Sequence, residues 1–343
     1  MRLYQVGKSL GLILTVLAGT VAANDLPRTN DGHPDLSGVW DFRTLTPLQR
    51  PANQADKTTL SADEAQEIEA RSRQATAAND EPSDANRGAP QAGTDVGTYN
   101  RFWVDSGAEV SEDLRTSLIV DPPNGRVPPL RDGVATQSMG GTDTTDLPVR
   151  FRVGGLGTHG PESRGIAERC LLGFNSGPPI LPGGYNQNIR ISQTSDHVVI
   201  LNEMVHDARI VPLAGQPRLG LLTWMGESRG RWEDDTLVVE TINFHEQLPS
   251  FSGTFFTAVG TAEKLVVTEQ FRRIDADTLR YEFTVEDPAT YDVPITAVML
   301  MRKSDERLYE YACHEGNYAM RNMLAGARAT ERFEEAEAVQ ARN

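Results

Sequence analysis

The stretch "KLVVTEQFRRIDADTLRYEFTVE" (264–286) contains two strand-like runs joined by a short polar turn. On both sides of Asp275-Ala276-Asp277, β-branched and aromatic residues alternate with polar ones, and this period of two is typical of β-strands. A turn this short joins antiparallel neighbours, because parallel strands need a crossover of a dozen residues or more. The stretch therefore predicts a β-hairpin.

Three further pairs of strand-like runs repeat this pattern in the C-terminal half of the chain. Their turns lie at Ser195-Asp196, at Asp234-Asp235 and at 304–306. The runs that flank these turns are 188–194 with 197–203, 230–233 with 236–244, and 293–303 with 307–313. Antiparallel pairs at such regular spacing predict a mainly β fold, in which a meander forms a barrel or a sandwich.

The rest of the chain adds one strand, two helices and long loops. "DLSGVWDF" (35–42) predicts a first strand, and Ser61 and Glu64 have the capping-box spacing at the start of a helix over 60–74. The segment 131–187 is rich in Gly and Pro, and so long an irregular stretch favours functional loops. The parts we expect are a signal peptide (1–23), an N-terminal extension with the first strand, the helix and a flexible linker (24–100), a β-barrel domain (101–330) and a charged helical tail (331–343).

The first 23 residues have the pattern of a secretory signal. Arg2 and Lys8 precede a short apolar run, and small residues up to Ala23 resemble a cleavage site. The mature protein is therefore expected to be soluble and either periplasmic or secreted. The whole chain has a net charge of −15, and losing the two basic residues makes it −17 (31 Lys+Arg against 48 Asp+Glu). This charge excludes nucleic acid and anionic membrane as favoured partners, because both need a basic surface. It leaves the oligomeric state open.

Two cysteines, Cys170 and Cys313, are the whole cysteine content of the chain. In an oxidising compartment such a pair predicts a disulfide. Two free thiols remain an alternative, and Cys313 beside His314 allows a third interpretation as a thiol nucleophile.

Strand phase makes predictions about three carboxylates. Glu203, Glu240 and Glu269 each share the period-2 face of apolar neighbours, and Tyr281 does so in the next strand. A simple amphipathic sheet would place glutamates on the opposite face, so this phase favours a barrel with a polar-lined cavity. A buried carboxylate needs a partner. The candidate partners are Arg190, Arg209, Arg231 and His206. The opposite faces are also partly apolar, and the alternative is that these glutamates lie in solvent.

Two dense polar stretches give the candidate catalytic residues. His206 and Asp207 follow Glu203 within a few positions, and His314 and Glu315 follow Cys313. A histidine beside carboxylates suits general acid–base chemistry, although such residues also cap turns. No HxH or HExxH spacing joins the histidines, so we predict no metal site.

Arginines and aromatic residues give further candidate ligand-binding groups. Arg229 and Arg231 alternate along one run and could clamp an anion, or could pair with glutamates and leave no site. Arg209, Glu240 and Glu269 would line the interior with them. Tyr281 and Tyr311 could stack on a sugar or an aromatic ligand, although aromatic residues in strands first form the core.

Two resemblances follow from short motifs. Gly38-Val39-Trp40 resembles the G-x-W start of lipocalin-like barrels, which implies such a barrel with extra segments over 43–187, since this chain is about twice as long. The strings "ERC", "GPPILP", "EMVHDAR", "SRGRWEDDTLVVETINF" and "YACHEGN" are similar to those of a group of exported bacterial proteins whose activity is uncharacterised. This second resemblance covers most of 168–328 and implies a shared fold and export.

We therefore predict an exported, lipocalin-like antiparallel β-barrel that binds a small molecule inside. If it is an enzyme, carboxylate and histidine groups favour a lyase, isomerase or hydrolase. Such an enzyme would need no cofactor, since the sequence has no phosphate loop or G-x-S-x-G elbow. The alternatives are a periplasmic carrier or sensor without activity, and a structural or assembly protein.

Overall fold

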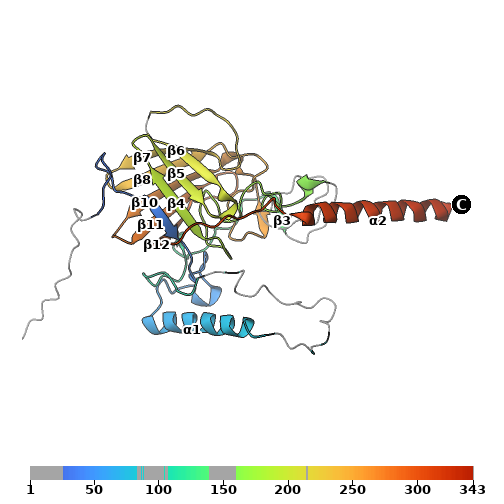
Figure 1. Cartoon of the computed structure of the whole chain (residues 1–343), viewed down its shortest axis with the longest axis horizontal. Helices are drawn as coiled ribbons and strands as arrows, with labels where there is room; N and C mark the ends of the chain where they lie inside the picture. The colour runs from blue at the N-terminus through green and yellow to red at the C-terminus, as the bar shows by residue number, and fades with distance from the viewer. Residues whose placement is uncertain are drawn as a thin grey trace, which may run out of the picture.

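The structure is a computed structural model of the whole chain, in which residues 26–82, 86, 88, 104, 107–138, 160–213 and 215–342 are described. The predicted signal peptide and most of the predicted linker lie outside these residues. Figure 1 shows a β body with one long helix extending from it.

A ten-stranded antiparallel sheet forms the body. Its strands run in the order β6-β5-β4-β1-β12-β11-β10-β8-β7, and β2 pairs separately with β12. The bounds of these strands are β1 (Gly38–Asp41), β2 (Ile119–Asp121), β4 (Asn188–Gln193), β5 (His197–Asn202), β6 (Ala208–Pro212), β7 (Glu227–Glu233), β8 (Thr236–Ile242), β10 (Val266–Arg273), β11 (Thr278–Glu286) and β12 (Ile295–Ser304). A second, two-stranded sheet joins β3 (Thr136–Ser138) to β9 (Thr257–Val259).

Three of the four predicted hairpins are confirmed, namely β4–β5, β7–β8 and β10–β11. The fourth is wrong, because 307–313 forms no strand. The place beside β12 is taken by the N-terminal strand β1, in a register that sets Trp40 opposite Lys303. On its other edge β1 pairs with β4, so the first strand joins the two halves of the meander.

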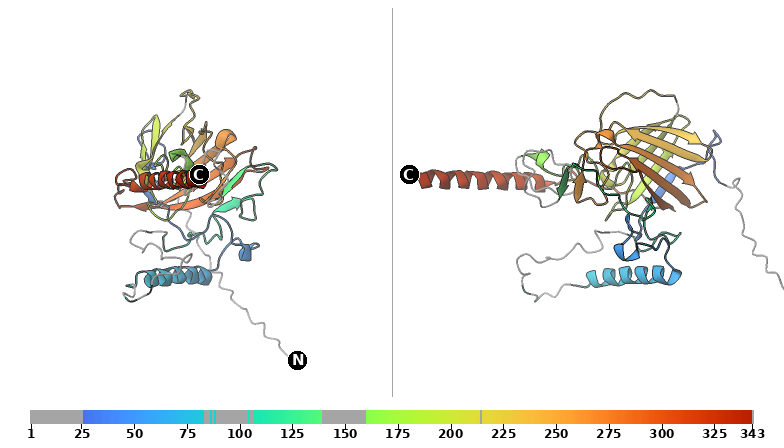
Figure 2. Two further views of the ribbon diagram at one scale, coloured as in Figure 1. Left: turned by 90° about the vertical axis from the view of Figure 1, so that its right-hand side faces the viewer. Right: turned by 180° about the vertical axis from the view of Figure 1, so that it is seen from behind.

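The sheet curls so that its two edge strands approach one another, as Figure 2 shows from two sides. Leu213, just after β6, forms an isolated bridge with Gly230 of β7, but no ladder connects these strands. A side chain at Gly230 would meet Leu213 at 2.8 Å and Val211 at 3.0 Å, so the close approach needs a glycine. The fold is thus a large, strongly curved antiparallel sheet that is not closed by strand pairing.

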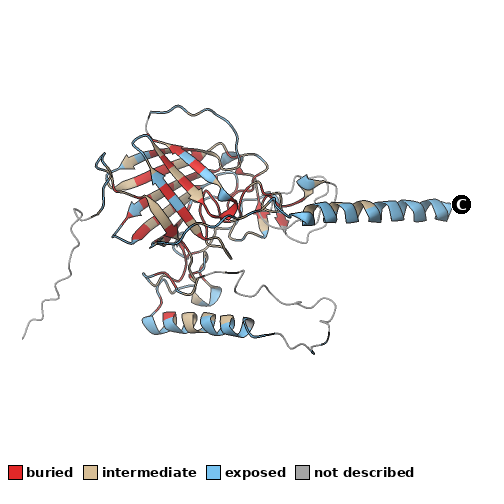
Figure 3. Ribbon diagram, in the orientation of Figure 1, coloured by how far each residue is buried: buried red, intermediate tan, exposed pale blue. Residues whose placement is uncertain are grey.

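Alternate residues of the strands fill the inside of this curve, which is marked by the red stretches in Figure 3. Trp40, Phe271 and Tyr281 are among the largest fully buried side chains. The segment 177–181 also enters the core, where Ile180 is fully buried. The backbone N–H of Ile180 donates a hydrogen bond to the Tyr281 hydroxyl at 2.9 Å. The inside of the sheet is therefore a packed core with a loop inserted into it.

Two helices lie outside the sheet. Helix α1 (Ala62–Asn79) begins with the predicted capping box, in which Ser61 and Glu64 each accept a backbone N–H of the other residue. It continues past the predicted end at 74, because the following residues include alanines, the best helix formers. Helix α2 (Tyr318–Arg342) continues through Gly326, projects from the body in Figure 1 and has no buried residue.

The remaining elements are short 3₁₀ turns: η1 (Ala52–Gln54), η2 (Pro161–Ser163), η3 (Met204–His206) and η4 (Ala262–Lys264). Across the described ranges, no helix combines the length and apolarity needed to cross a bilayer.

Candidate functional site

An ion pair lies at the centre of the core. Arg209 of β6 and Glu269 of β10 are fully buried and form a two-pronged salt bridge, in which Nη2 lies 2.9 Å from Oε1 and Nη1 contacts Oε2. The Tyr281 hydroxyl of β11 donates to the same Oε1 at 2.8 Å. We call these three residues the core triad. Because β6 and β10 are first and seventh in the strand order, their contact also shows how far the sheet curls.

Burial perturbs the ionisation of the triad. Desolvation and the nearby Glu269 carboxylate raise the pKa of the Tyr281 phenol well above its ordinary value, so the hydroxyl keeps its proton. Burial alone would lower the pKa of the Arg209 guanidinium, but the attraction of Glu269 outweighs this and raises it. Arg209 and Glu269 therefore form a neutralised pair, and this is the arrangement that a buried charge requires.

Glu203 is the second buried carboxylate, and its surroundings differ. It follows the last residue of β5, is 5% exposed and accepts hydrogen bonds from Asn188 Nδ2 at 2.9 Å and from the Tyr309 backbone N–H at 3.1 Å. No cation pairs with it within the part of the chain that the structure describes. A buried carboxylate that has only neutral donors is a candidate for a functional role.

Four buried side-chain amide atoms of three asparagines, among them the Glu203 partner Asn188, have no hydrogen-bond partner among the described residues. They are Oδ1 of Asn175, Oδ1 of Asn188, and both Oδ1 and Nδ2 of Asn202. We call Glu203 and these three asparagines the amide cluster. Asn188 begins β4, Asn202 ends β5, and the pairing of these strands sets Asn202 opposite the next residue, Ile189. Native proteins leave few such atoms unpaired, because each costs free energy when it is removed from water.

The amide cluster and the core triad meet at β5 and β6. The register pairs Ile200 with Arg209, and the inward-facing Asn202 lies two residues further along the same face. Asn202 and Arg209 are thus diagonal neighbours on the inside of the sheet. The Nε atom of Arg209, which the salt bridge does not use, is also buried without a partner in the described chain. Unused donors and acceptors therefore share one part of the interior.

A row of partly buried aromatic rings includes Tyr185, whose backbone oxygen accepts a hydrogen bond from Asn175 of the amide cluster. Tyr311 stacks on Tyr185 with ring centroids 6.1 Å apart, and Phe174 has edge contacts with Tyr185 at 5.3 Å and with Phe255 at 5.6 Å. Phe255 also lines an open pocket of about 210 Å³, together with Leu181, Gly183 and residues of 44–48.

Asn175 supports the wall of this pocket. Its Nδ2 atom lies 3.4 Å from where a side chain at Gly183 would begin, and the same Nδ2 donates to the backbone oxygens of Tyr185 and Asn186 at 3.2 Å. The pocket, the aromatic row and Asn175 therefore belong to one end of the sheet, which we call the mouth.

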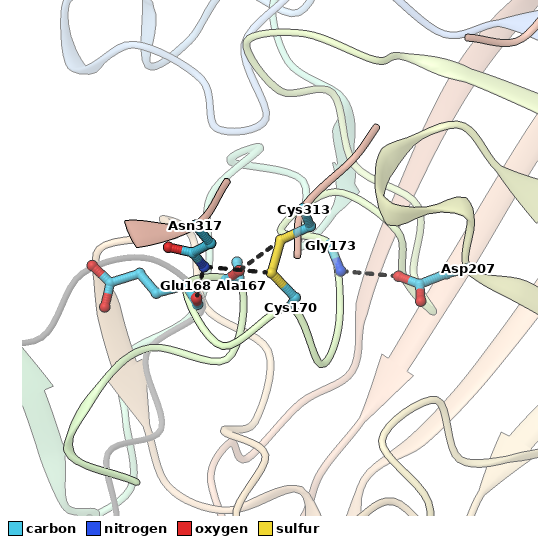
Figure 4. The surroundings of a disulfide bond; sticks show 7 residues. All are labelled: Ala167, Glu168, Cys170, Gly173, Asp207, Cys313 and Asn317. Carbon is cyan, nitrogen blue, oxygen red and sulfur yellow. Dashed lines mark hydrogen bonds between the residues drawn. A yellow bond between two sulfur atoms is a disulfide. The ribbon is translucent and has the colours of Figure 1, made fainter. Parts of the chain in front are cut away.

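The predicted disulfide is confirmed, and Figure 4 shows its surroundings. Cys170 and Cys313 are bonded, and Asn317 Nδ2 donates to the Glu168 backbone oxygen at 3.3 Å. Asp207 Oδ2 accepts the N–H of Gly173 at 2.9 Å. The disulfide excludes a thiol nucleophile at Cys313. It instead ties the segment before α2 to the loop that carries Asn175.

The structure brings together only some of the predicted site residues. Glu269, Tyr281 and Arg209 meet in the core, Glu203 is buried beside Asn188, and Tyr311 belongs to the aromatic row at the mouth. The predicted catalytic residues His206, His314 and Glu315 are exposed, and Asp207 is occupied by Gly173. Arg190 is exposed as well.

Three predicted interior residues lie on the outside of the sheet instead. Glu240 is 46% exposed and pairs with Arg218, Arg229 pairs with Glu227, and Arg231 pairs with Glu233. The phase prediction for Glu240 is wrong because β8 is apolar on both faces, and the inward residues are Leu237, Val239 and Thr241.

The burial of Glu203 is confirmed, but its predicted cause is wrong. The inward residues of β5 are Val198, Ile200 and Asn202, so strand phase alone would turn Glu203 outward. The chain leaves the strand at this point, because Glu203 has helical backbone angles and begins the η3 turn. The bend, rather than the alternation, turns its carboxylate inward.

The asparagines of the amide cluster were not predicted from the sequence. Asn175, Asn188 and Asn202 all occur near strand ends or in loops, where Asn commonly serves turns. The one available signal was Asn202, which continues the period-2 phase of Val198 and Ile200 into the core.

The described ranges hold no group of three or more His, Cys, Asp or Glu residues that could bind a metal ion. The sequence matches no protein-family model and no curated protein sequence.

Proposed function

We propose that this is an exported protein that binds a small, neutral, polar molecule at the mouth, with the curved sheet serving as a barrel around the ligand. The observation that carries the proposal is the amide cluster, in which buried amide atoms without partners accompany a buried carboxylate that no cation of the described chain pairs with. A ligand that satisfied these atoms would recover the free energy that their burial costs. The disulfide and the signal-like residues 1–23 support a periplasmic or secreted location.

The charges around the cluster favour a neutral ligand. Arg209 is already neutralised by Glu269, so an anionic ligand would add an unpaired buried charge beside Glu203. Asn202 offers one donor atom, Nδ2 with its two N–H groups, and one acceptor atom, Oδ1, and Arg209 Nε offers a further donor. A carboxamide, or a hydroxyl beside a carbonyl, presents the complementary groups. The aromatic row at the mouth suits a ring or a sugar face attached to such a group.

Binding is favoured over the expected carboxylate–histidine chemistry, which would need a histidine close to the carboxylate. The hydrogen-bond partners of Glu203 in the described chain are an amide and a backbone N–H, and His206 and His314 are exposed. We therefore propose a carrier or sensor rather than a lyase, isomerase or hydrolase.

Native mass spectrometry of the protein purified from the periplasm without unfolding tests this proposal. The wild type should carry a small organic mass that the denatured chain lacks. Asn202→Leu should lose it, because leucine keeps the volume but removes the donor and the acceptor. Glu240→Gln on the outer face is the matched control and should keep it. A bare wild-type mass, together with unchanged amide chemical shifts around Asn202 on titration with small amides and alcohols, would contradict the proposal.

A further inference from the structure

The segment 215–226 before β7 exposes three leucines. Leu219, Leu221 and Leu222 are 74%, 60% and 58% exposed. The one residue between them is a glycine, so this stretch of four residues has no charged side chain. The loop arches away from the body above β6 and β7 in Figure 1. Single exposed leucines are ordinary, but three within four positions form a contiguous apolar tip.

A network of charged groups beneath the tip holds this loop in place. Glu227 accepts the backbone N–H groups of Leu219 and of Gly220, the latter at 3.1 Å, and also the Asn243 amide at 2.9 Å. These hydrogen bonds outweigh desolvation, which acts in the opposite direction, and lower the pKa of the Glu227 carboxyl, so it stays ionised at neutral pH.

Two arginines complete the network. Arg218 donates to the Glu240 carboxylate at 2.6 Å, and Arg229 donates to the Gln216 backbone oxygen at 3.1 Å and pairs with Glu227 at 3.0 Å. Each of these charges has an opposite partner within the network. The leucines therefore point outward because the backbone is fixed, and the tip carries no unpaired charge into an apolar environment.

We propose that this leucine tip docks on an uncharged lipid surface by inserting its side chains among the acyl chains. The three side chains expose on the order of 300 Å², well below the roughly 800 Å² per partner of a stable protein interface. The loop projects from the body in Figure 1, so its tip offers a small contact, whereas a protein interface needs a wider one. The net charge of −15 repels anionic headgroups, so the surface that fits is zwitterionic. The contact is peripheral and does not depend on the small-molecule site.

Flotation with phosphatidylcholine vesicles tests this docking. The full mature protein should float with the vesicles. The partition coefficient of the triple variant Leu219→Ser, Leu221→Ser and Leu222→Ser between vesicles and solution should be at least tenfold lower. The matched control removes three exposed aliphatic side chains elsewhere (Val120→Ser, Leu130→Ser, Val293→Ser) and should partition like the wild type. Circular dichroism before flotation checks that each variant is folded.

A second variant tests the insertion itself. After the wild-type spectrum is subtracted, the tryptophan emission of Leu221→Trp should shift to the blue when vesicles are added. The emission of Val293→Trp should stay unshifted. Absence of wild-type flotation, or equal flotation of the triple variant, would overturn the proposal. It would also be overturned if the triple variant changed a wild-type dimer to a monomer in analytical ultracentrifugation, since the tip would then be a protein interface.

Discussion

Glu269 and Glu203 are both buried carboxylates of the same sheet, yet their surroundings are opposite in kind. Glu269 has a salt bridge to Arg209 and a hydrogen bond from Tyr281, so its charge is compensated in the core. Glu203 has two neutral donors, and the amides around it keep unused hydrogen-bonding atoms. A compensated buried charge serves the fold, whereas an incompletely satisfied polar group is available to bind something else. Variants at the two glutamates and around them should separate these two roles.

The core triad should be the more costly site to disrupt. Glu269→Ala leaves the Arg209 guanidinium buried without a counter-charge, and we expect it to lower the free energy of unfolding by about 3–5 kcal/mol. The control Glu233→Ala breaks an exposed pair with Arg231 and should cost less than about 1 kcal/mol. Urea denaturation followed by circular dichroism measures both values. Equal effects would contradict a structural role for the triad.

The stability lost in Glu269→Ala should come from the uncompensated charge of Arg209 and not from the loss of a charged residue as such. The double variant Arg209→Met with Glu269→Leu removes both charges and keeps the volume, so it should lose much less stability than Glu269→Ala alone. The same denaturation experiment decides this. A double variant as unstable as the single one would mean that the charges themselves organise the sheet.

The disulfide should act mainly at the mouth. It closes a sequence separation of 143 residues, and replacing Cys170 and Cys313 by Ser should lower the free energy of unfolding by about 2–4 kcal/mol. Because Cys170 lies just before the loop that carries Asn175, hydrogen exchange should speed up most over 171–187. Amides of β10 and β11 should exchange more slowly and should change only through global unfolding. Uniform acceleration in every strand would contradict a local role.

Removing an amide of the cluster should stabilise the protein. Asn202→Leu eliminates two buried polar atoms that have no partner in the described chain, and we expect the free energy of unfolding of ligand-free protein to rise by about 1–3 kcal/mol. The wild type should recover the difference when ligand is bound. Thermal denaturation of both proteins, with and without a bound molecule, measures this. A destabilised Asn202→Leu variant would show that the amide serves the fold.

Alkaline pH should weaken the core triad but not the amide cluster. The pKa of Tyr281 is raised in the folded protein, so the native state keeps a proton that the unfolded chain loses. The stability from this tyrosine is fully present below about pH 10 and is lost as the pH rises above it. In Tyr281→Phe the decline above that pH should be shallower than in the wild type, by about 1.4 kcal/mol per pH unit. The free energy of unfolding of Tyr281→Phe should still decline with pH, because burial also raises the pKa of Tyr291. Parallel pH profiles would contradict this assignment.

The sequence predicted the triad better than the amide cluster, for a physical reason. β10 alternates regularly, so its phase placed Glu269 in the core, and Tyr281 followed in β11. β8 is apolar on both faces, so its phase could not decide the side of Glu240. The pairing of β1 with β12 is non-local. The run 307–313 contains no local signal that β1, rather than this run, pairs with β12. Unsatisfied amides arise only when several chain segments meet, so no local pattern contains them.

The most direct test of the central claim is a crystal structure of the protein purified from the periplasm without refolding, at a resolution that shows ordered water. Our account predicts density larger than a water molecule, hydrogen-bonded to the side-chain amide of Asn202 and to Arg209 Nε, beside an unchanged salt bridge to Glu269. Water alone at these atoms, or side chains rearranged so that the asparagines pair with one another, would contradict it and would make Glu203 as structural as Glu269.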